Sequence, residues 1–410
     1  MVRMSAVIDS RVVQAGDVFY ALPGEKRDGH EFVEAALAAG AATAVIARAQ
    51  AGQFPALLAS RLRVVDDPVR ALQADAQAAR RAWGGPLVAI TGSAGKTTTK
   101  EMIAAVLGTK IRVLKNEGNY NNHLGVPLTL LRLQPEHEVA VVEMGMNHAG
   151  EIAALAAIAE PTVGVFTNVG SAHLGNFSSI EGIAEAKREL ARAIPETGAL
   201  VLNRDDARVA RFGEGFGGRV VMYSAAEFTG KLQLAGEHNR ANAAAAMAVG
   251  GLFGIDAHAA LEALAALRPM TGRGEIVQHN GITMIQDCYN ANPEAMLRML
   301  AVLAATPARR HVAVLGEMRE LGAAGGRLHR EVGRAAAASN LDALWAVGGE
   351  AEQILEGARA AGFPGPTQFC GSAAEAAVQL RPYLHAGDAV LFKASHALHL
   401  EEAVEALRRG

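Results

Sequence analysis

The sequence predicts an α/β protein built from three domains. The chain has 410 residues, whereas a single hydrophobic core stops growing at roughly 250–300 residues. Short apolar runs alternate with helical patterns, which is typical of βαβ units and a parallel sheet. Clusters of glycine and proline at 84–86 and 268–274 interrupt this alternation. We therefore place domains at 1–84, 85–268 and 269–410.

The first domain is predicted to be a small mixed α/β unit running from Ala6 to Trp83. A Gly-Asp turn at 16–17 precedes a short apolar strand at 18–22, and an alanine-rich helix ends at Gly40. No glycine-rich phosphate loop occurs in this segment.

The second and third domains both show the βα alternation of a parallel sheet. In the second, helical patterns such as 151–159 separate the apolar runs, and a long alanine-rich helix begins near residue 239. The third domain continues in the same way, so it is a further α/β unit. The predicted strands are 87–91, 139–142 and 163–167 in the second domain, and 282–286, 312–315, 343–347 and 389–392 in the third.

Composition excludes several classes of protein. Half of the residues are hydrophobic and 20% are charged, which is typical of a globular chain. The formal net charge of -3 gives no reason to expect a nucleic-acid partner. The uncharged apolar stretch 243–255 is 13 residues long, short of the roughly 20 that span a membrane, so we expect no span.

The expected compartment is the cytoplasm. Asp9 and Arg11 stand where a signal peptide needs an apolar region. The two cysteines, Cys288 and Cys370, form neither a disulfide framework nor a metal-ligand spacing, and two free thiols suit a reducing compartment.

The strongest local motif lies between the predicted strand 87–91 and a helix that begins near Lys96. The motif is a glycine-rich turn, Gly-Ser-Ala-Gly at 92–95, followed by Lys96 and Thr97. Backbone N–H groups of a glycine-rich turn converge on an anion, the lysine neutralises phosphate charge, and the threonine hydroxyl can bind Mg²⁺. Ile90 occupies the place of the usual first glycine, so the loop is a short variant. The alternative is a glycine-rich turn that only caps a helix. The predicted ATP-binding residues of this loop are Gly92, Ser93, Ala94, Gly95, Lys96, Thr97 and Thr98.

Polar residues follow the neighbouring strands at the edge where α/β sheets bind ligands. Glu143 ends the run 139–142, and His173 follows the strand at 163–167. Both suit Mg²⁺ or its bound water, although either residue could be structural. Lys187 lies in a helical pattern whose ordinary interpretation is a solvated face, and on the residues alone that interpretation is favoured.

Two amide-rich segments are further candidates. The loop 116–127, which is expected to lie between helix-like segments, contains Asn119, Asn121 and Asn122. Their amides suit a sugar or phosphate. The alternative is a turn-rich surface loop. At 236–242 a helix opens with Asn239 and Asn242 on one face. These amides could contact an adenine edge or simply cap the helix.

These motifs, in this order, resemble those of the Mur ligases of bacterial peptidoglycan synthesis. The loop 92–98 is similar to the family's phosphate loop, 119–127 to its N-x-N-N-x-x-G-x-P segment, and 236–242 to its G-x-H-N-x-x-N helix start. Segment 287–293, Asp-Cys-Tyr-Asn-Ala-Asn-Pro, resembles the signature of the member that adds D-alanyl-D-alanine, and 315–322 agrees with that choice.

The resemblance implies a central P-loop ATPase-like domain, a C-terminal Rossmann-like domain and roles for individual residues. Lys96 would bind the ATP phosphates. Mg²⁺ would occupy two sites, one held by Thr97 and Glu143 and the other by His173 and a carbamylated Lys187. The implied ATP contacts also include His238, Asn239, Asn242, Arg273 and Asp287. The implied UDP-substrate contacts are Ser10, Arg11, Asn119, Asn121 and Asn122, and the D-alanyl-D-alanine side is Tyr289, Asn290 and Asn292.

The sequence departs from the family pattern at two places. The family's D-D-S-Y segment is here Gln286-Asp287-Cys288-Tyr289, which keeps the second acid and replaces the serine hydroxyl with a thiol. The family's K-G-S-R segment is Lys393-Ala394-Ser395-His396, which weakens the usual arginine contact or makes it titratable.

The implied activity is that of a monomeric ATP-dependent ligase that joins UDP-N-acetylmuramoyl-tripeptide to D-alanyl-D-alanine through an acyl phosphate. Other Mur ligases and a folylpolyglutamate-synthase-like ligase share this route. A nucleotide-dependent switch or ATP-binding module is the alternative from another class, and an inactive scaffold is the weakest.

Overall fold

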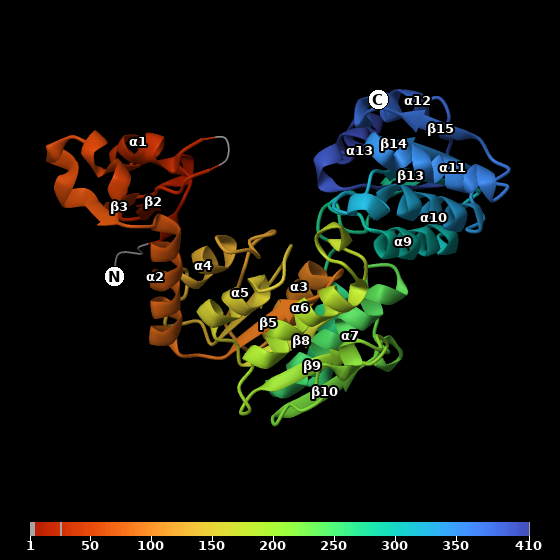
Figure 1. Ribbon diagram of the computed structural model, residues 1–410. Helices are drawn as coiled ribbons and strands as arrows, with labels where there is room; N and C mark the ends of the chain where they lie inside the picture. Colours follow the sequence, from red (N-terminus) through yellow and green to blue (C-terminus); the bar gives the residue numbers. More distant parts are fainter. Residues whose placement is uncertain (1–4, 25–26, 410) are drawn as a thin grey trace.

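The computed structural model describes residues 5–24 and 27–409. Three sheets follow one another along this part of the chain, each within its own α/β unit. The N-terminal and C-terminal units lie on either side above the central unit (Figure 1). The predicted α/β class with parallel sheets is confirmed.

The N-terminal unit contains a four-stranded parallel sheet in the order β1-β2-β3-β4. Its core includes Phe19, Val33 and Ile46, none of which is exposed. The helix α1 ends two residues before Gly40, which has the left-handed φ of 114°. Its elements are β1 (Ala6–Val7), β2 (Val18–Tyr20), α1 (Val33–Ala38), β3 (Thr43–Ala47) and β4 (Leu62–Val65).

Helix α2 (Pro68–Trp83) connects this unit to the central one. The Asp67 side chain caps its start by accepting hydrogen bonds from two backbone N–H groups, and Gly84 ends it in the left-handed conformation. Arg80, which is buried, donates to the Ala159 carbonyl oxygen at 2.7 Å. This contact fixes the helix against the central unit.

The central unit contains a six-stranded parallel sheet in the order β10-β9-β8-β5-β7-β6. Because β5 lies between β7 and β8, the loops that follow these three strands meet at one edge. The strands are β5 (Leu87–Thr91), β6 (Val113–Lys115), β7 (Val139–Glu143), β8 (Val163–Phe166), β9 (Ala199–Asn203) and β10 (Arg219–Tyr223).

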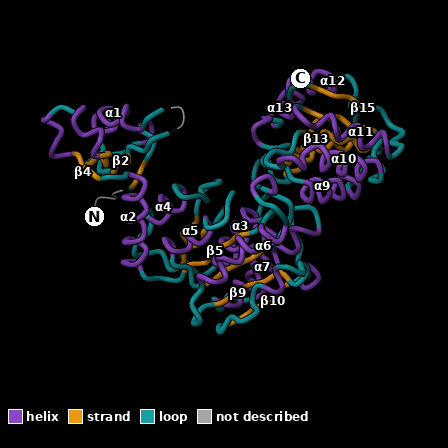
Figure 2. The backbone as a smooth tube through the Cα atoms, viewed as in Figure 1, coloured by secondary structure: helices purple, strands orange, loops and turns teal. Residues whose placement is uncertain are grey.

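Helices cover both faces of this sheet (Figure 2), so its four inner strands, β9, β8, β5 and β7, are fully buried. Helices α3, α7 and α8 pack on one face, and α5 and α6 on the other. Strand β6 precedes the loop 116–124, so the expectation of helix-like segments on both sides of that loop is wrong. The helices are α3 (Lys96–Leu107), α4 (Gly125–Leu130), α5 (Glu151–Ala159), α6 (Ile180–Ala193), α7 (Glu237–Leu252) and α8 (Ala257–Ala266).

The C-terminal unit has a six-stranded sheet in the order β11-β12-β16-β13-β14-β15, parallel except at β11. The four predicted strands all lie within observed ones. Its strands are β11 (Glu275–His279), β12 (Ile282–Asp287), β13 (Arg310–Gly316), β14 (Ala343–Val347), β15 (Thr367–Cys370) and β16 (Asp388–Lys393). Helices α9 (Pro293–Ala305), α10 (Gly325–Ala337) and α11 (Glu352–Ala360) cover one face, and α12 (Ala373–Leu380) and α13 (Glu401–Arg408) cover the other.

Within the described residues, no helix has both the length and the apolar character needed to cross a bilayer.

Candidate active site

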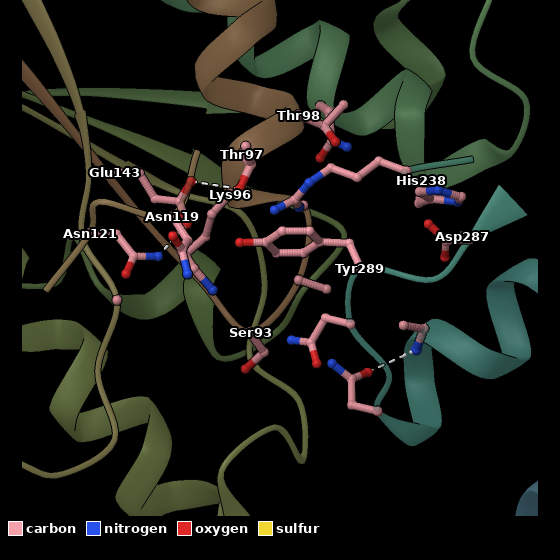
Figure 3. Close-up of a pocket in the computed structure, with 18 of the residues that line it drawn as sticks. Ser93, Lys96, Thr97, Thr98, Asn119, Asn121, Glu143, His238, Asp287 and Tyr289 are labelled. Carbon is pink, nitrogen blue, oxygen red and sulfur yellow. Dashed lines mark hydrogen bonds between the residues drawn. The ribbon is translucent and has the colours of Figure 1, made fainter. Parts of the chain in front are cut away.

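A cavity of about 340 Å³ lies between the central and C-terminal units. Figure 3 shows Lys96, Thr97 and Glu143 on the central side, with Tyr289 projecting toward them from the C-terminal side. The structure therefore gathers side chains that are far apart in sequence. The predicted site residues that line the cavity are Ser93, Ala94, Gly95, Lys96, Thr97, Thr98, Asn119, Asn121, Asn122, Glu143, His173, His238, Asn239, Asn242, Arg273, Asp287, Tyr289, Asn290 and Asn292.

Four predicted residues do not line this cavity. Gly92 lies at the base of the phosphate loop, and Lys187 is buried within the central unit. Ser10 and Arg11 lie in the N-terminal unit, where Arg11 pairs with Asp9 at 2.6 Å and keeps 86% of its side chain exposed.

Two glycines shape the loop between β5 and α3. Gly92 has a φ of 154°, and a Cβ there would lie 1.8 Å from Thr167 Oγ1. Gly95 has a φ of 81°, and its Cβ would lie 2.7 Å from Asn242 Oδ1. Side chains are excluded at both positions, so the backbone can approach an anion closely. Helix α3 begins directly after this turn, and its first N–H groups have no partner within the helix.

Asn168 fixes the shape of this loop from the end of β8. Ser93 N donates to the Asn168 carbonyl oxygen at 2.9 Å, and Ala94 N donates to Asn168 Oδ1 at 3.0 Å. The Asn168 amide in turn donates to the Ala94 carbonyl oxygen at 2.9 Å. The sequence contained Asn168 in the Thr-Asn-Val-Gly run after the strand, but nothing in the run indicated this pairing.

Lys96 is held at the start of α3. Its Nζ donates to the Gly92 carbonyl oxygen at 2.8 Å. Desolvation lowers its pKa, and the neighbouring Glu143 carboxylate opposes that shift. The ammonium thus lies in a poorly solvated position, where its attraction for phosphate is stronger than in water.

Glu143 is the centre of a buried hydrogen-bond network at the end of β7. Thr97 Oγ1 and Asn121 Nδ2 each donate to its carboxylate at 2.7 Å. Asn116, which is fully buried, accepts from the Glu143 backbone N–H at 2.9 Å. Asn116 was not among the predicted site residues, although it begins the amide-rich loop 116–127.

The hydroxyl and carboxylate of this network are hard oxygen donors that lie in contact. They fit the ligand preference of Mg²⁺, which takes one or two protein oxygens and completes its shell with water and phosphate.

Lys187 is not on a solvated helix face, so the interpretation favoured by the residues alone is wrong. Only 2% of it is exposed, and it lies on the buried side of α6 with Ile183 and Leu190. Desolvation first, and the charge of Lys96 second, hold the pKa of Lys187 well below its ordinary value. A lowered pKa favours the neutral amine, which is the reactive form toward CO₂.

His173 contacts the C-terminal unit directly. Its Nδ1 lies 2.5 Å from a carboxylate oxygen of Glu320, and this contact lowers the pKa of Glu320. His173 also has a left-handed φ of 65°, which is uncommon for a residue other than glycine. As an amine, Lys187 has no anionic oxygen to offer a hard cation, so its predicted role as a magnesium ligand fits only the carbamate form.

A second contact across the two units is made by Glu294 at the start of α9. Its carboxylate accepts from Ser171 N at 2.8 Å and from Ser171 Oγ at 2.9 Å. These partners are 123 residues apart in sequence, and Ser171 lies two residues before His173. The sequence carried no signal for this pairing.

Replacing Glu294 with alanine is expected to weaken the contact between the two units. Hydrogen bonds to a charged group contribute about 1.5–3 kcal/mol, so the arrangement with a complete ATP site becomes less populated, and the apparent ATP dissociation constant rises about tenfold. Calorimetric titration with a non-hydrolysable ATP analogue measures the change. Exposed Glu352→Ala on α11 is the control, and an unchanged ATP affinity in Glu294→Ala would contradict the assignment.

The C-terminal side of the cavity presents a cation and an aromatic ring. Arg273 lies over the Tyr289 ring at 3.8 Å from its centroid. Lys393 Nζ donates to Asp287 at 2.5 Å and to the Asn290 carbonyl oxygen at 2.8 Å. His396, which stands where the family pattern has an arginine, stacks on the Tyr289 ring, with the two ring centroids 5.4 Å apart.

The helix start at 236–242 contributes a neutral imidazole and two buried amides. Burial is the main cause that lowers the pKa of His238 to about 4. Asn242 accepts from Thr99 Oγ1 and donates to Asn239 Oδ1, both at 3.1 Å, and Asn239 donates to the Ala235 carbonyl oxygen. The amides therefore connect α7 to α3 and to its own preceding turn while also lining the cavity.

Three other predicted amides have local backbone partners. Asn122 Oδ1 accepts from Gly125 N at 2.9 Å, and Asn292 Oδ1 accepts from Ala295 N at 2.9 Å at the start of α9. Asn290 Oδ1 accepts from Ala291 N at 2.8 Å. These side chains fix the loops at the cavity edge.

Profiles of the Mur ligase family match most of the chain. The "Mur ligase family, catalytic domain" matches 6–83, the "Mur ligase middle domain" matches 90–230, and the "Mur ligase, glutamate ligase domain" matches 272–396. The chain belongs to the Mur ligase family.

Within this family the chain is similar to ligases that share one name. It is 38% identical to the UDP-N-acetylmuramoyl-tripeptide–D-alanyl-D-alanine ligase of Synechocystis, over 97% of this chain and 90% of that protein. The crystal structure of MurF from Acinetobacter baumannii matches with a TM-score of 0.89 and 32% identity, over 99% of this chain and 93% of that one. MurF from Thermotoga maritima in complex with ADP matches with a TM-score of 0.86 and 29% identity, over 99% and 97%.

Proposed function

We propose that this chain is an ATP-dependent ligase that joins D-alanyl-D-alanine to UDP-N-acetylmuramoyl-tripeptide in peptidoglycan precursor synthesis. The observation that carries the proposal is the shared cavity, in which the phosphate loop and Glu143 face Arg273 and Tyr289 from the next unit. The relatives with this activity in their names align over nearly the whole chain.

A carboxylate is a poor acyl donor because its leaving group would be oxide. In the proposed reaction a carboxylate oxygen of the tripeptide attacks the γ-phosphorus of ATP, the bond to the β-phosphate oxygen breaks, and an acyl phosphate and ADP form. The D-alanyl-D-alanine amine then attacks the acyl carbon and expels inorganic phosphate, and the nitrogen loses a proton.

The residues of the chain position this reaction and stabilise its charge. Backbone N–H groups of 92–98 cradle the phosphates, and the Lys96 ammonium neutralises charge that builds during transfer. Arg273 approaches from the opposite unit, so the site is complete only when the units are together. This arrangement also keeps water from the acyl phosphate.

Two magnesium positions are part of the proposal. Thr97 and Glu143 would hold the first, and His173 with a carbamylated Lys187 would hold the second. Bound Mg²⁺ supplies charge neutralisation for the phosphoryl oxygens. Addition of CO₂ to the neutral Lys187 amine releases one proton and leaves an anionic oxygen donor, which suits a hard cation.

The remaining residues are assigned by position. We assign 1–84, with Ser10 and Arg11, to the uridine nucleotide, 85–268 to ATP, and 269–410 to ATP and D-alanyl-D-alanine. We assign Asn119, Asn121 and Asn122, which line the cavity, to the UDP-linked substrate. We assign the protein to the cytoplasm, because ATP and the UDP-linked substrate are cytoplasmic nucleotides. We also propose that it acts as a monomer.

The test is a phosphate-release assay with ATP, Mg²⁺, UDP-N-acetylmuramoyl-tripeptide and D-alanyl-D-alanine. Phosphate release should require both the peptide and the amine, and mass spectrometry should find the pentapeptide product. Release without the amine would identify an ATP-hydrolysing switch, and product formation with a single amino acid in its place would identify another member of the family.

A further inference from the structure

A second polar cluster lies outside the cavity, where the chain passes from β16 into α13. His396, His399 and Glu401 each direct one possible ligand atom toward the others, and the three atoms lie within 4.8 Å of one another. Among residues 5–24 and 27–409, this is the one group of three such side chains close enough to share a metal ion. The two histidines are exposed and Glu401 is half-buried.

The separations approach those of a coordination shell. Glu401 Oε1 lies 3.4 Å from His399 Nδ1 and 3.9 Å from His396 Nδ1. A tetrahedral ion with bonds of about 2.0–2.2 Å keeps its ligand atoms about 3.3–3.6 Å apart. Small side-chain rotations would therefore bring all three atoms to one ion.

The backbone conformation of 396–401 brings these three side chains together. His399 adopts a left-handed φ of 49° at the end of the short turn His396–Leu398, and Leu400, which is fully buried, anchors the chain between the ligands. Glu401 Oε2 is buried and has no hydrogen-bond partner in the described part of the chain. A buried carboxylate oxygen without a partner is costly, and a cation bound to the same carboxylate through Oε1, the oxygen within 4 Å of both histidines, would offset part of that cost.

We propose that His396, His399 and Glu401 form a site for a borderline divalent transition metal, for which Zn²⁺ is the representative ion. Two imidazoles and one carboxylate match this class, whereas Mg²⁺ prefers oxygen ligands alone. Three protein ligands leave a position open for water. The site is distinct from Thr97 and Glu143, and it does not depend on the proposed ligase activity.

This site adjoins one wall of the cavity. The His396 ring stacks on Tyr289 with an interplanar angle of 16°, and Tyr289 lies beneath Arg273. Metal binding would fix the His396 ring and thereby restrict Tyr289. The replacement of the family's arginine by His396 thus exchanges a permanent charge for a metal ligand.

The test is equilibrium binding of Zn²⁺ to the full-length chain in excess Mg²⁺. Wild type should bind one Zn²⁺, and His399→Gln and Glu401→Gln should each weaken binding at least about tenfold. The control is His258→Gln on α8, where an exposed histidine and Glu262 form a two-residue pair at 3.7 Å. This variant should bind as wild type does.

A spectroscopic arm identifies the ligands. Co²⁺ bound to wild type should give the visible absorption of a four-coordinate ion with nitrogen ligands, and His399→Gln should lose it. Equal Zn²⁺ affinity in wild type and all variants would overturn the proposal. So would binding that is lost in His173→Gln but retained in His399→Gln, because the metal would then occupy the cavity.

Discussion

Replacing Lys96 with alanine is expected to lower kcat about a thousandfold. The Lys96 ammonium lies at the start of α3 in a poorly solvated position, next to the backbone turn that would hold the phosphates. The negative charge on the transferred phosphoryl group is spread over its oxygens, so a preorganised cation stabilises the transition state more than the ground state. Rapid-quench measurement of ADP formation in a single turnover reports this step.

Two variants distinguish the loss of a catalytic charge from a structural effect. Lys110→Ala, at an exposed position just beyond the same helix, should retain wild-type activity. Lys96→Arg should restore charge but recover activity only in part, since the planar guanidinium does not match the position of a compact ammonium. Full single-turnover activity in Lys96→Ala would remove the phosphate loop from the proposed mechanism.

The predicted strands of the second and third domains coincide with observed ones because parallel strands buried on both faces are nearly continuous apolar runs, but β6, β9, β10, β11 and β15 were not predicted. Leu87–Thr91 is fully buried and is bounded by turn residues on both sides, so its limits could be found without the structure. The phosphate loop was equally clear, because a glycine-rich turn between a buried strand and a helix has few other uses.

Side-chain burial within helices was harder to predict. Lys187 lies in a helix with many charged residues, and its position relative to the core depends on how α6 packs against the sheet. Periodicity alone did not assign the lysine to the buried side, since a buried lysine contradicts the usual pattern. Only the resemblance to a family assigned it a role.

Contacts between the units were also beyond sequence analysis. The pairs Glu294–Ser171 and Glu320–His173 join the central unit to the C-terminal unit, and their existence depends on how the two units meet. The same limit applied to Asn116, whose amide partner is the backbone of a strand that follows it by 27 residues. The local sequence pattern around each residue carries no information on such long-range pairs.

The two departures from the family pattern have different consequences in the structure. Cys288 is buried, and its thiol donates to the Phe392 carbonyl oxygen at 3.4 Å, while burial raises its pKa. The thiol therefore substitutes for a hydroxyl as a donor and remains unreactive. His396 instead faces solvent and stacks on Tyr289, so this departure changes the surface beside the cavity.

Lys187→Met is expected to abolish most activity without destabilising the protein. If the carbamate of Lys187 supplies a ligand for the second Mg²⁺, the loss of that oxygen should lower kcat by about a hundredfold to a thousandfold. The free energy of unfolding should not fall, because methionine has a similar shape and needs no desolvation of an amine. Steady-state kinetics and thermal unfolding of the same preparation separate the two effects.

The contribution of Lys187 to the pH dependence of the protein's stability has a definite sign. In the amine form of Lys187, the folded-state pKa lies well below its ordinary value of 10.5. Between these two values the unfolded chain binds the proton and the folded chain does not, so the Lys187 contribution to stability increases as pH rises through this window. Lys187→Met removes this contribution, and its unfolding temperature should depend less on pH there.

Dependence on CO₂ tests the carbamate itself. Wild-type activity should decline after prolonged removal of CO₂ and bicarbonate and should return when bicarbonate is added, because carbamate formation on a neutral amine is reversible. Lys187→Met should not respond to bicarbonate at all. If the variant is inactive while wild type is indifferent to CO₂, then Lys187 acts as an amine, and the second magnesium position must be held without it.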